Sequence, residues 1–135
     1  MGRVQLAINV TDIDEAIAFY SKLFSTEPAK RRPGYANFAI ADPPLKLVLM
    51  QGTTGGTLNH LGVEVETTGE VAAAAERLSS QGLETKAESG TCCYAEQDKV
   101  WVRDPDGAPW EVYTVIADAE TMSPAAETAE SCACC

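Results

Sequence analysis

The sequence predicts an α+β fold made of two similar halves, and three observations indicate it. A strand-like segment, residues 4–10, recurs as residues 59–65 at a constant spacing, so that Gln5 corresponds to His60. An amphipathic helical pattern follows each copy, and short alternating segments follow each helix. The length of 135 residues fits one domain, or two small modules that share a core.

The first module is predicted to span residues 1–52. Residues 4–10 alternate apolar and other side chains, which is typical of a half-buried strand. A helix is expected from Asp12, which is a plausible N-cap because Glu15 follows three residues later. Two short strands, residues 35–41 and 45–50, then flank an Asp-Pro-Pro turn.

The second module is predicted to span residues 58–116, after a linker at residues 53–57 with the sequence TTGGT. Its first strand is residues 59–65, and its helix begins at Gly69 and stops near Gly82. Strands at residues 100–103 and 110–116 flank an Asp-Pro-Asp-Gly turn. Residues 117–135 are expected to form an acidic, cysteine-rich and mobile C-terminal tail.

One such module cannot bury both faces of its sheet. Two modules can pair their sheets into a curved cup with the helices outside. The sequence therefore predicts a concave interior in which a ligand would lie.

Composition excludes several classes of function. The formal net charge of -10 argues against a nucleic-acid binder, which needs a basic patch. The sequence contains no apolar run of the roughly eighteen residues that a membrane helix requires, and no signal-peptide pattern. We therefore expect no membrane partner and a cytoplasmic location.

Cysteine usage points to metal, metalloid or redox chemistry. The sequence has five cysteines, an odd number, and they fall into two clusters, which is a poor framework for disulfides. Without a signal peptide we also expect a reducing compartment. The five cysteines are Cys92, Cys93, Cys132, Cys134 and Cys135.

Strand alternation places three polar residues on the less apolar face of their strands. These are Gln5, His60 and Glu111, and they would point into the cup if the helices cover the apolar faces. An amide, an imidazole and a carboxylate are a facial ligand set for a divalent metal. Lys46 or Leu47 corresponds to Glu111 in the first module, and neither is a usual ligand, so coordination positions would stay open. The alternative interpretation is a structural histidine beside polar surface.

Two segments resemble the hallmark sequences of the vicinal oxygen chelate superfamily: LAINVTDIDEAIAFYSKLF and VWVRDPDGAPWEVYTV. This superfamily includes glyoxalase I, extradiol dioxygenases, fosfomycin-modifying thiol transferases and bleomycin-binding proteins. The resemblance covers about residues 3–116 and implies two βαβββ modules that form a paired, cup-shaped mixed sheet. It also implies that Gln5, His60 and Glu111 are the metal ligands.

The segment SGTCCYAEQDKVWVRDPDG narrows the resemblance, together with Gln5 in place of a first histidine. With both features, the sequence is similar to the organoarsenical carbon–arsenic lyases and the cadmium-induced proteins. This implies an enzyme that uses non-heme Fe(II) and O2 to cleave the C–As bond of trivalent organoarsenicals and release arsenite. Cys92 and Cys93 would capture the arsenic. A homodimer is compatible with the resemblance.

The paired cysteines need a particular backbone, because adjacent residues on a regular strand point to opposite faces. We expect loop geometry near Gly90 and Thr91 to bring the two thiols together. Five further residues are weaker pocket candidates and stay outside the predicted site, because they are typical of sheet packing or solvated surface: Tyr94, Lys99, Trp101, Arg103 and Tyr113.

Two other functions remain open. One is a non-enzymatic, thiol-based protein that binds Cd(II) or As(III) through its cysteines. The other is a fosfomycin-type thiol transferase, although such enzymes usually present histidine where Gln5 stands and do not require paired cysteines.

Overall fold

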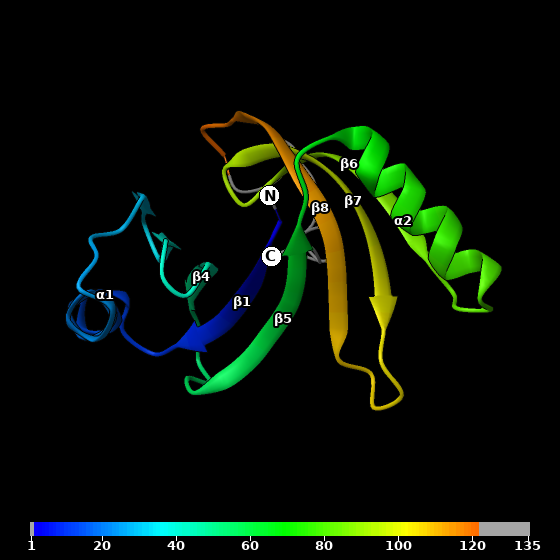
Figure 1. The fold of residues 1–135 in the computed structure, drawn as a ribbon. Coiled ribbons are helices and arrows are strands. Elements are labelled where there is room, and N and C mark those ends of the chain that lie inside the picture. The colour runs from blue at the N-terminus through cyan, green and yellow to red at the C-terminus, as the bar shows by residue number, and fades with distance from the viewer. Residues whose placement is uncertain (1, 122–135) are drawn as a thin grey trace. The chain divides into compact units, whose positions relative to one another are not determined.

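The computed structural model describes residues 2–121, which form two compact units. One unit is Arg3–Leu61, and the other contains Gly2 and residues 62–121 of the described chain. The boundary falls inside strand β5 (Thr57–Glu64). Along the chain, one strand, one helix and three strands occur twice. Figure 1 shows α1 following β1 and α2 following β5. The predicted α+β class with two βαβββ modules is therefore confirmed, while the exact module limits stay a prediction.

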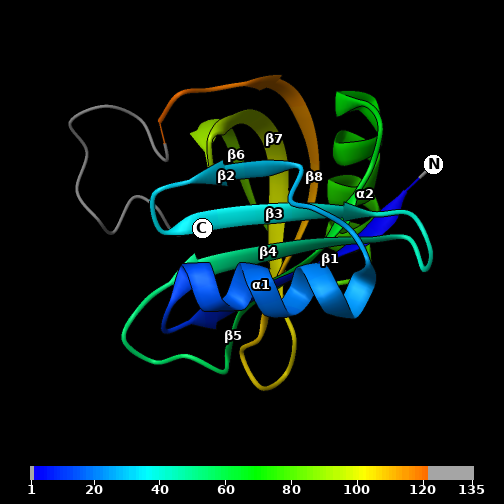
Figure 2. The same ribbon diagram turned by 90° about the vertical axis from the view of Figure 1, so that its left-hand side faces the viewer.

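The first unit contains β1 (Arg3–Val10), α1 (Ile13–Phe24), β2 (Lys30–Arg32), β3 (Tyr35–Ile40) and β4 (Leu45–Gln51). Its strand order is β2-β3-β4-β1-β5. Strands β2, β3 and β4 pair antiparallel, whereas β1 and β4 are parallel because helix α1 and two strands intervene. Figure 2 shows α1 running along one face of this sheet.

Helix α1 begins and ends where its sequence dictates. The Asp12 side chain accepts a hydrogen bond from the backbone N–H of Glu15 at 3.0 Å, as predicted for an N-cap. The helix ends at Phe24, and its C-cap residue Ser25 has the left-handed φ of 50°. Its inner face packs on one side of the sheet to form the core of this unit, which consists of Ile13, Ile17, Ala36, Phe38, Ile40, Leu47 and Leu49.

The core identifies the two faces of β1. Leu6, Ile8 and Val10 pack against this cluster. Side chains alternate along a strand, so Gln5 and Ala7 point to the face away from α1, and both are buried there. The alternation predicted from the sequence thus separates an apolar, helix-covered face from a face that carries Gln5.

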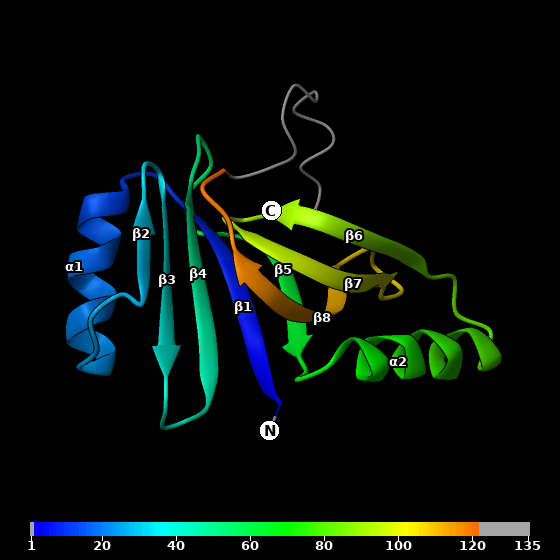
Figure 3. The same ribbon diagram turned by 90° about the horizontal axis from the view of Figure 1, so that it is seen from above.

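The second unit contains α2 (Thr68–Ser80), β6 (Lys86–Cys92), β7 (Ala95–Arg103) and β8 (Pro109–Asp118), with the strand order β5-β8-β7-β6. Strands β6, β7 and β8 are antiparallel, and Figure 3 shows them side by side. Helix α2 packs on β7 and β8, and its buried residues are Val71 and Ala74. It is followed by Gly82, the predicted stop, at a φ of 88°.

The two strands without a specific prediction, β2 and β6, are the edge strands of their units. An edge strand has one hydrogen-bonded neighbour and need not bury a row of apolar side chains. Strand β6 is accordingly polar and mostly exposed or half-buried until Cys92. Neither helix in residues 2–121 has the length and hydropathy of a membrane span.

Candidate active site

In the first unit, Gln5 and His60 are brought together by β1 and β5. Their exposed fractions are only 4% and 2%. The Gln5 Nε2 atom lies 3.2 Å from the His60 Nε2 atom. An amide nitrogen can only donate here, so the imidazole Nε2 accepts and carries a lone pair. Two of the predicted ligands are therefore neighbours within one unit.

This geometry tests whether the pair suits a divalent metal. An imidazole nitrogen that carries a lone pair is the form that binds metals. A carboxamide ligates through its oxygen, so Gln5 would have to rotate its amide to present Oε1. The residue types fit a metal such as Fe(II). Within residues 2–121, no group of three or more His, Cys, Asp or Glu side chains that could hold a metal ion occurs.

In the second unit, Glu111 is paired with Lys99. Both side chains are 2% exposed, and the Lys99 Nζ atom lies 2.7 Å from the Glu111 Oε1 atom. The same ammonium donates to the Cys92 Sγ atom at 3.6 Å. It also lies 5.5 Å from the ring centre of Trp101 and 5.9 Å from that of Tyr113. One buried cation therefore joins a predicted metal ligand to a predicted arsenic ligand.

The two cysteines occupy the hairpin that joins β6 to β7. Cys92 pairs with Ala95, so the turn consists of Cys93 and Tyr94. Both have left-handed backbone angles, with φ of 52° and 63°, as a two-residue hairpin turn of this kind requires. The expectation of loop geometry at Gly90 and Thr91 was wrong about its place, because β6 includes both residues.

The turn brings the Cys92 and Cys93 Sγ atoms to 3.3 Å from each other. This separation exceeds the roughly 2.05 Å of a disulfide, so the two sulfurs are not bonded to each other. At this separation of the two sulfurs, one soft atom that forms bonds of about 2.3 Å, the length of a Zn–S bond, can bind both of them. Cys93 is in no disulfide, whereas Cys92 is disulfide-bonded in this structure, so joint capture of a ligand requires reduction of Cys92.

Backbone strain also marks this turn. A non-glycine residue in the left-handed region costs about 1–2 kcal/mol, and two successive residues adopt it here. Strain of this kind is concentrated at functional sites. No sequence pattern indicates this turn, because Cys93-Tyr94 occupies the position at which an Asn-Gly pair usually indicates it.

Lys99 is the functional candidate that sequence reasoning left outside the site. It was expected to be solvated, and that expectation was wrong, because only 3% of the residue is exposed. Arg103 is exposed as expected, and Tyr113 is buried. Strand alternation could have indicated this burial, because Lys99 shares one face of β7 with Gln97 and Trp101.

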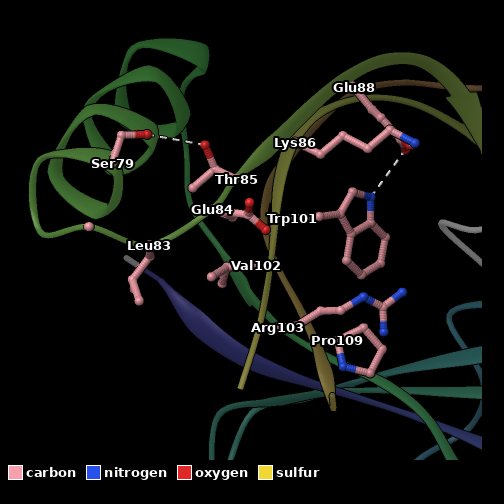
Figure 4. Close-up of a pocket in the computed structure, with 11 residues that line it drawn as sticks. Ser79, Leu83, Glu84, Thr85, Lys86, Glu88, Trp101, Val102, Arg103 and Pro109 are labelled. Atoms are coloured by element: carbon pink, nitrogen blue, oxygen red, sulfur yellow. Dashed lines mark hydrogen bonds and ion pairs between the residues drawn. The ribbon is translucent and has the colours of Figure 1, made fainter. Parts of the chain in front are cut away.

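A pocket of about 800 Å³ lies elsewhere in the second unit, along α2, β6 and β7 (Figure 4). The lining includes Trp101, Arg103, Lys86, Leu83 and Pro109. Figure 4 shows Trp101 and Arg103 on one side of the backbone and Leu83 on the other. None of the predicted site residues lines this pocket. Cys132, Cys134 and Cys135 lie outside the described residues.

Comparisons with known proteins agree with this fold. A solved structure, the Mn(II)-bound glyoxalase from Novosphingobium aromaticivorans, superposes with a TM-score of 0.64 at 18% identity, over 93% of this chain and 44% of that one. At this identity the likeness concerns the fold alone.

Two curated relatives are much more similar in sequence. The cadmium-induced protein CadI of Mycobacterium tuberculosis (strain ATCC 25618 / H37Rv) is 65% identical over 90% of this chain and 82% of its own length. The trivalent organoarsenical cleaving enzyme of Thermomonospora curvata is 58% identical over 100% of this chain and 89% of its own. Residues 2–112 also match a family described as Glyoxalase/Bleomycin resistance protein/Dioxygenase superfamily. The chain therefore belongs to this superfamily, and within it to the family of the cadmium-induced proteins and trivalent organoarsenical cleaving enzymes.

Proposed function

We propose that this protein cleaves the carbon–arsenic bond of trivalent organoarsenicals, with Fe(II) and O2, and releases inorganic arsenite for detoxification. The observation that carries the proposal is the position of Lys99, whose Nζ atom contacts both the Cys92 sulfur and the Glu111 carboxylate. A substrate held by the cysteines would thus lie beside a carboxylate suited to a metal. The relative that is 58% identical and named for this cleavage supports the same reaction.

The roles we propose follow the chemistry of each group. Cys92 and Cys93 bind the arsenic, because thiolates bind thiophilic atoms and two bind better than one. Gln5, His60 and Glu111 hold the Fe(II), which when bound supplies O2 activation at its open coordination positions. Lys99 keeps the Glu111 carboxylate in place and balances its buried charge.

The reaction balances without a further reductant. Methylarsonous acid, CH3As(OH)2, and one O2 contain the same atoms as arsenous acid, As(OH)3, and formaldehyde. The carbon–arsenic bond breaks, the methyl carbon loses four electrons, and O2 gains them. Arsenic stays trivalent throughout. The proposal therefore predicts two products in equal amounts, both of which can be measured.

The test is an aerobic incubation of the reduced, Fe(II)-loaded protein with methylarsenite, in which arsenite and formaldehyde are quantified. We expect both products at equal amounts. Cys93→Ser should abolish turnover and keep iron binding, whereas His60→Ala should lose iron and turnover and keep stoichiometric capture of arsenic. If the loaded wild-type protein releases neither product, the cleavage proposal is rejected.

A second candidate is a thiol-based protein that binds Cd(II) or As(III) without catalysis. The relative at 65% identity that is named as cadmium-induced favours it, as do the adjacent sulfurs. The two functions differ in their dependence on the imidazole. Under the binding function, cells that express His60→Ala keep full resistance to both cadmium and methylarsenite. Under the cleavage function, these cells lose methylarsenite resistance.

A further inference from the structure

A chain of hydrogen bonds in the first unit leads from a backbone carbonyl to the ring of His60. The Thr57 hydroxyl donates to the Thr54 carbonyl at 2.7 Å. The Asn9 amide nitrogen donates to the Thr57 Oγ1 atom at 2.9 Å, and the Asn59 amide nitrogen donates to the Asn9 Oδ1 atom at 3.0 Å. The Asn59 Oδ1 atom lies 2.8 Å from the His60 Nδ1 atom.

The direction of this chain is fixed at its far end. A carbonyl oxygen can only accept, so the single hydroxyl proton of Thr57 is committed to Thr54. The Thr57 oxygen must then accept from Asn9, which turns the Asn9 amide so that its oxygen faces Asn59.

The same logic carries on to the imidazole. Asn59 must present its nitrogen to Asn9 and its oxygen to His60. The His60 Nδ1 atom faces an acceptor and therefore carries the proton.

The opposite side of the ring agrees with this assignment. The Gln5 Nε2 atom can only donate, and it faces the His60 Nε2 atom at 3.2 Å. The hydrogen bonds that start at Thr54 thus require the tautomer with a proton on Nδ1 and a lone pair on Nε2, and the contact with Gln5 agrees with it. A second partner that fixes the tautomer of a ligating histidine typically changes metal affinity 10- to 100-fold when it is lost.

The chain of hydrogen bonds starts at the Thr54 carbonyl, within residues 53–57, the segment that the sequence predicts to be a linker. Residues 53–57 turn tightly over the end of β1, where the Gly56 N–H donates to the Asn9 carbonyl at 2.8 Å. A Cβ atom on Gly55 would lie 2.7 Å from the Thr11 backbone nitrogen, so only glycine allows this approach. The turn therefore places the Thr54 carbonyl where Thr57 and Asn9 can use it.

We propose that Asn59 and Asn9, anchored by Thr57 and the Thr54 carbonyl, are positioning residues that hold His60 in the Nδ1–H tautomer and direct its Nε2 lone pair into the site. The use of that lone pair by a metal rests on the proposed function. The tautomer itself does not.

Histidine occurs once in this sequence, which makes the test direct. In the full-length, metal-free protein labelled with [15N]histidine, long-range 1H–15N spectra at alkaline pH report which ring nitrogen carries the proton. We expect Nδ1–H in the wild type. A neutral ring that is protonated on Nε2 would overturn the inference, and this result needs no variant.

Variants then test the chain itself. Asn59→Ala should move the ring toward the Nε2–H tautomer, and Asn9→Ala should do so in part, whereas Asn59→Asp keeps an acceptor and should preserve Nδ1–H. Thr26→Ala is the matched control, since it removes a side-chain hydrogen bond to Phe24 in the same unit, away from this chain. An unchanged tautomer in Asn59→Ala would overturn the role of Asn59.

A second readout separates this inference from the proposed function. Metal affinity is measured by titration of the metal-free protein with Fe(II) under anaerobic conditions. We expect Asn59→Ala to weaken binding about 10- to 100-fold and Asn59→Asp to restore it. If the wild type shows Nδ1–H and binds no Fe(II), the metal function fails and the tautomer assignment stands. If it binds Fe(II) with equal affinity in Asn59→Ala, the positioning role fails.

Discussion

At the scale of single residues, the second unit depends on a buried charge that sequence patterns alone place on the surface. Lysine is seldom fully buried unless it is paired, and Lys99 is paired with Glu111. The lysine side chain also contacts the Cys92 sulfur and the faces of two aromatic rings. This arrangement couples the stability of the unit to the geometry of its candidate site.

Replacement of this lysine should be costly. Lys99→Met leaves the Glu111 carboxylate as a buried charge without its ammonium partner, and we expect a loss of about 3–5 kcal/mol in the free energy of unfolding. Urea denaturation measures the change. Lys86→Met is the control, because the Lys86–Glu88 ion pair is 3.4 Å long with a lysine side chain 74% exposed, and exposed pairs contribute at most about 1 kcal/mol. Equal losses in the two variants would contradict the assigned burial.

At the scale of elements, turns and caps fix where the strands and helices begin. The Cys93–Tyr94 turn pairs Cys92 with Ala95, and the tight turn at residues 53–57 leads the chain from β4 into β5. Both turns bring site residues to their positions, although Thr57, the first residue of β5, is their only residue in a regular element.

The turn at residues 53–57 predicts a difference between two glycines. Gly55→Ala should destabilise the protein and shift the His60 tautomer, because the added Cβ atom would lie 2.7 Å from the Thr11 backbone nitrogen and displace the turn. Gly52→Ala should change neither property beyond about 0.5 kcal/mol, since its Cβ atom would meet nothing within 4 Å. Denaturation and the labelled-histidine spectrum compare the two. Identical behaviour would show that the close approach does not constrain this segment.

Helix α2 has a complete capping box. The Thr67 hydroxyl accepts from the Glu70 N–H at 3.1 Å, and the Glu70 carboxylate accepts from the Thr67 N–H at 3.0 Å. We expect Thr67→Ala to cost about 1 kcal/mol of unfolding free energy. In a double-mutant cycle with Glu70→Ala, the two losses should be less than additive, because either change disrupts one shared motif. Full additivity would mean that the two hydrogen bonds act independently.

At the scale of the whole molecule, the proposed metal site links binding to folding. If Fe(II) binds the folded chain and not the unfolded chain, it stabilises the fold by mass action. The gain is about 2.7 kcal/mol when the concentration of free metal is 100 times the dissociation constant. Anaerobic thermal unfolding measures this gain. We expect His60→Ala to lose the gain and Cys93→Ser to keep it. Stabilisation that survives in His60→Ala and disappears in Cys93→Ser would place the metal on the thiols instead.

The sequence by itself determined what repeats and alternates. The repeat of a strand and a helix predicted the two βαβββ modules, since a pattern of buried and exposed side chains is a local property of each segment. The N-cap at Asp12 and the helix stop at Gly82 could be predicted for the same reason. Alternation also placed Gln5 on the face away from α1, which the core of the first unit confirms.

The tertiary structure alone decided which of these groups touch. Lys99 is buried because its ammonium forms an ion pair with Glu111 on the neighbouring strand. A local sequence pattern does not predict an ion-pair partner twelve residues away. The hydrogen bonds from Thr54 through Asn9 to His60 join segments about fifty residues apart, and the left-handed turn at Cys93 contradicts its residues' own preferences. Local pattern fixes the faces and ends of elements, whereas hydrogen-bond direction and charge pairing depend on neighbours that only the folded chain supplies.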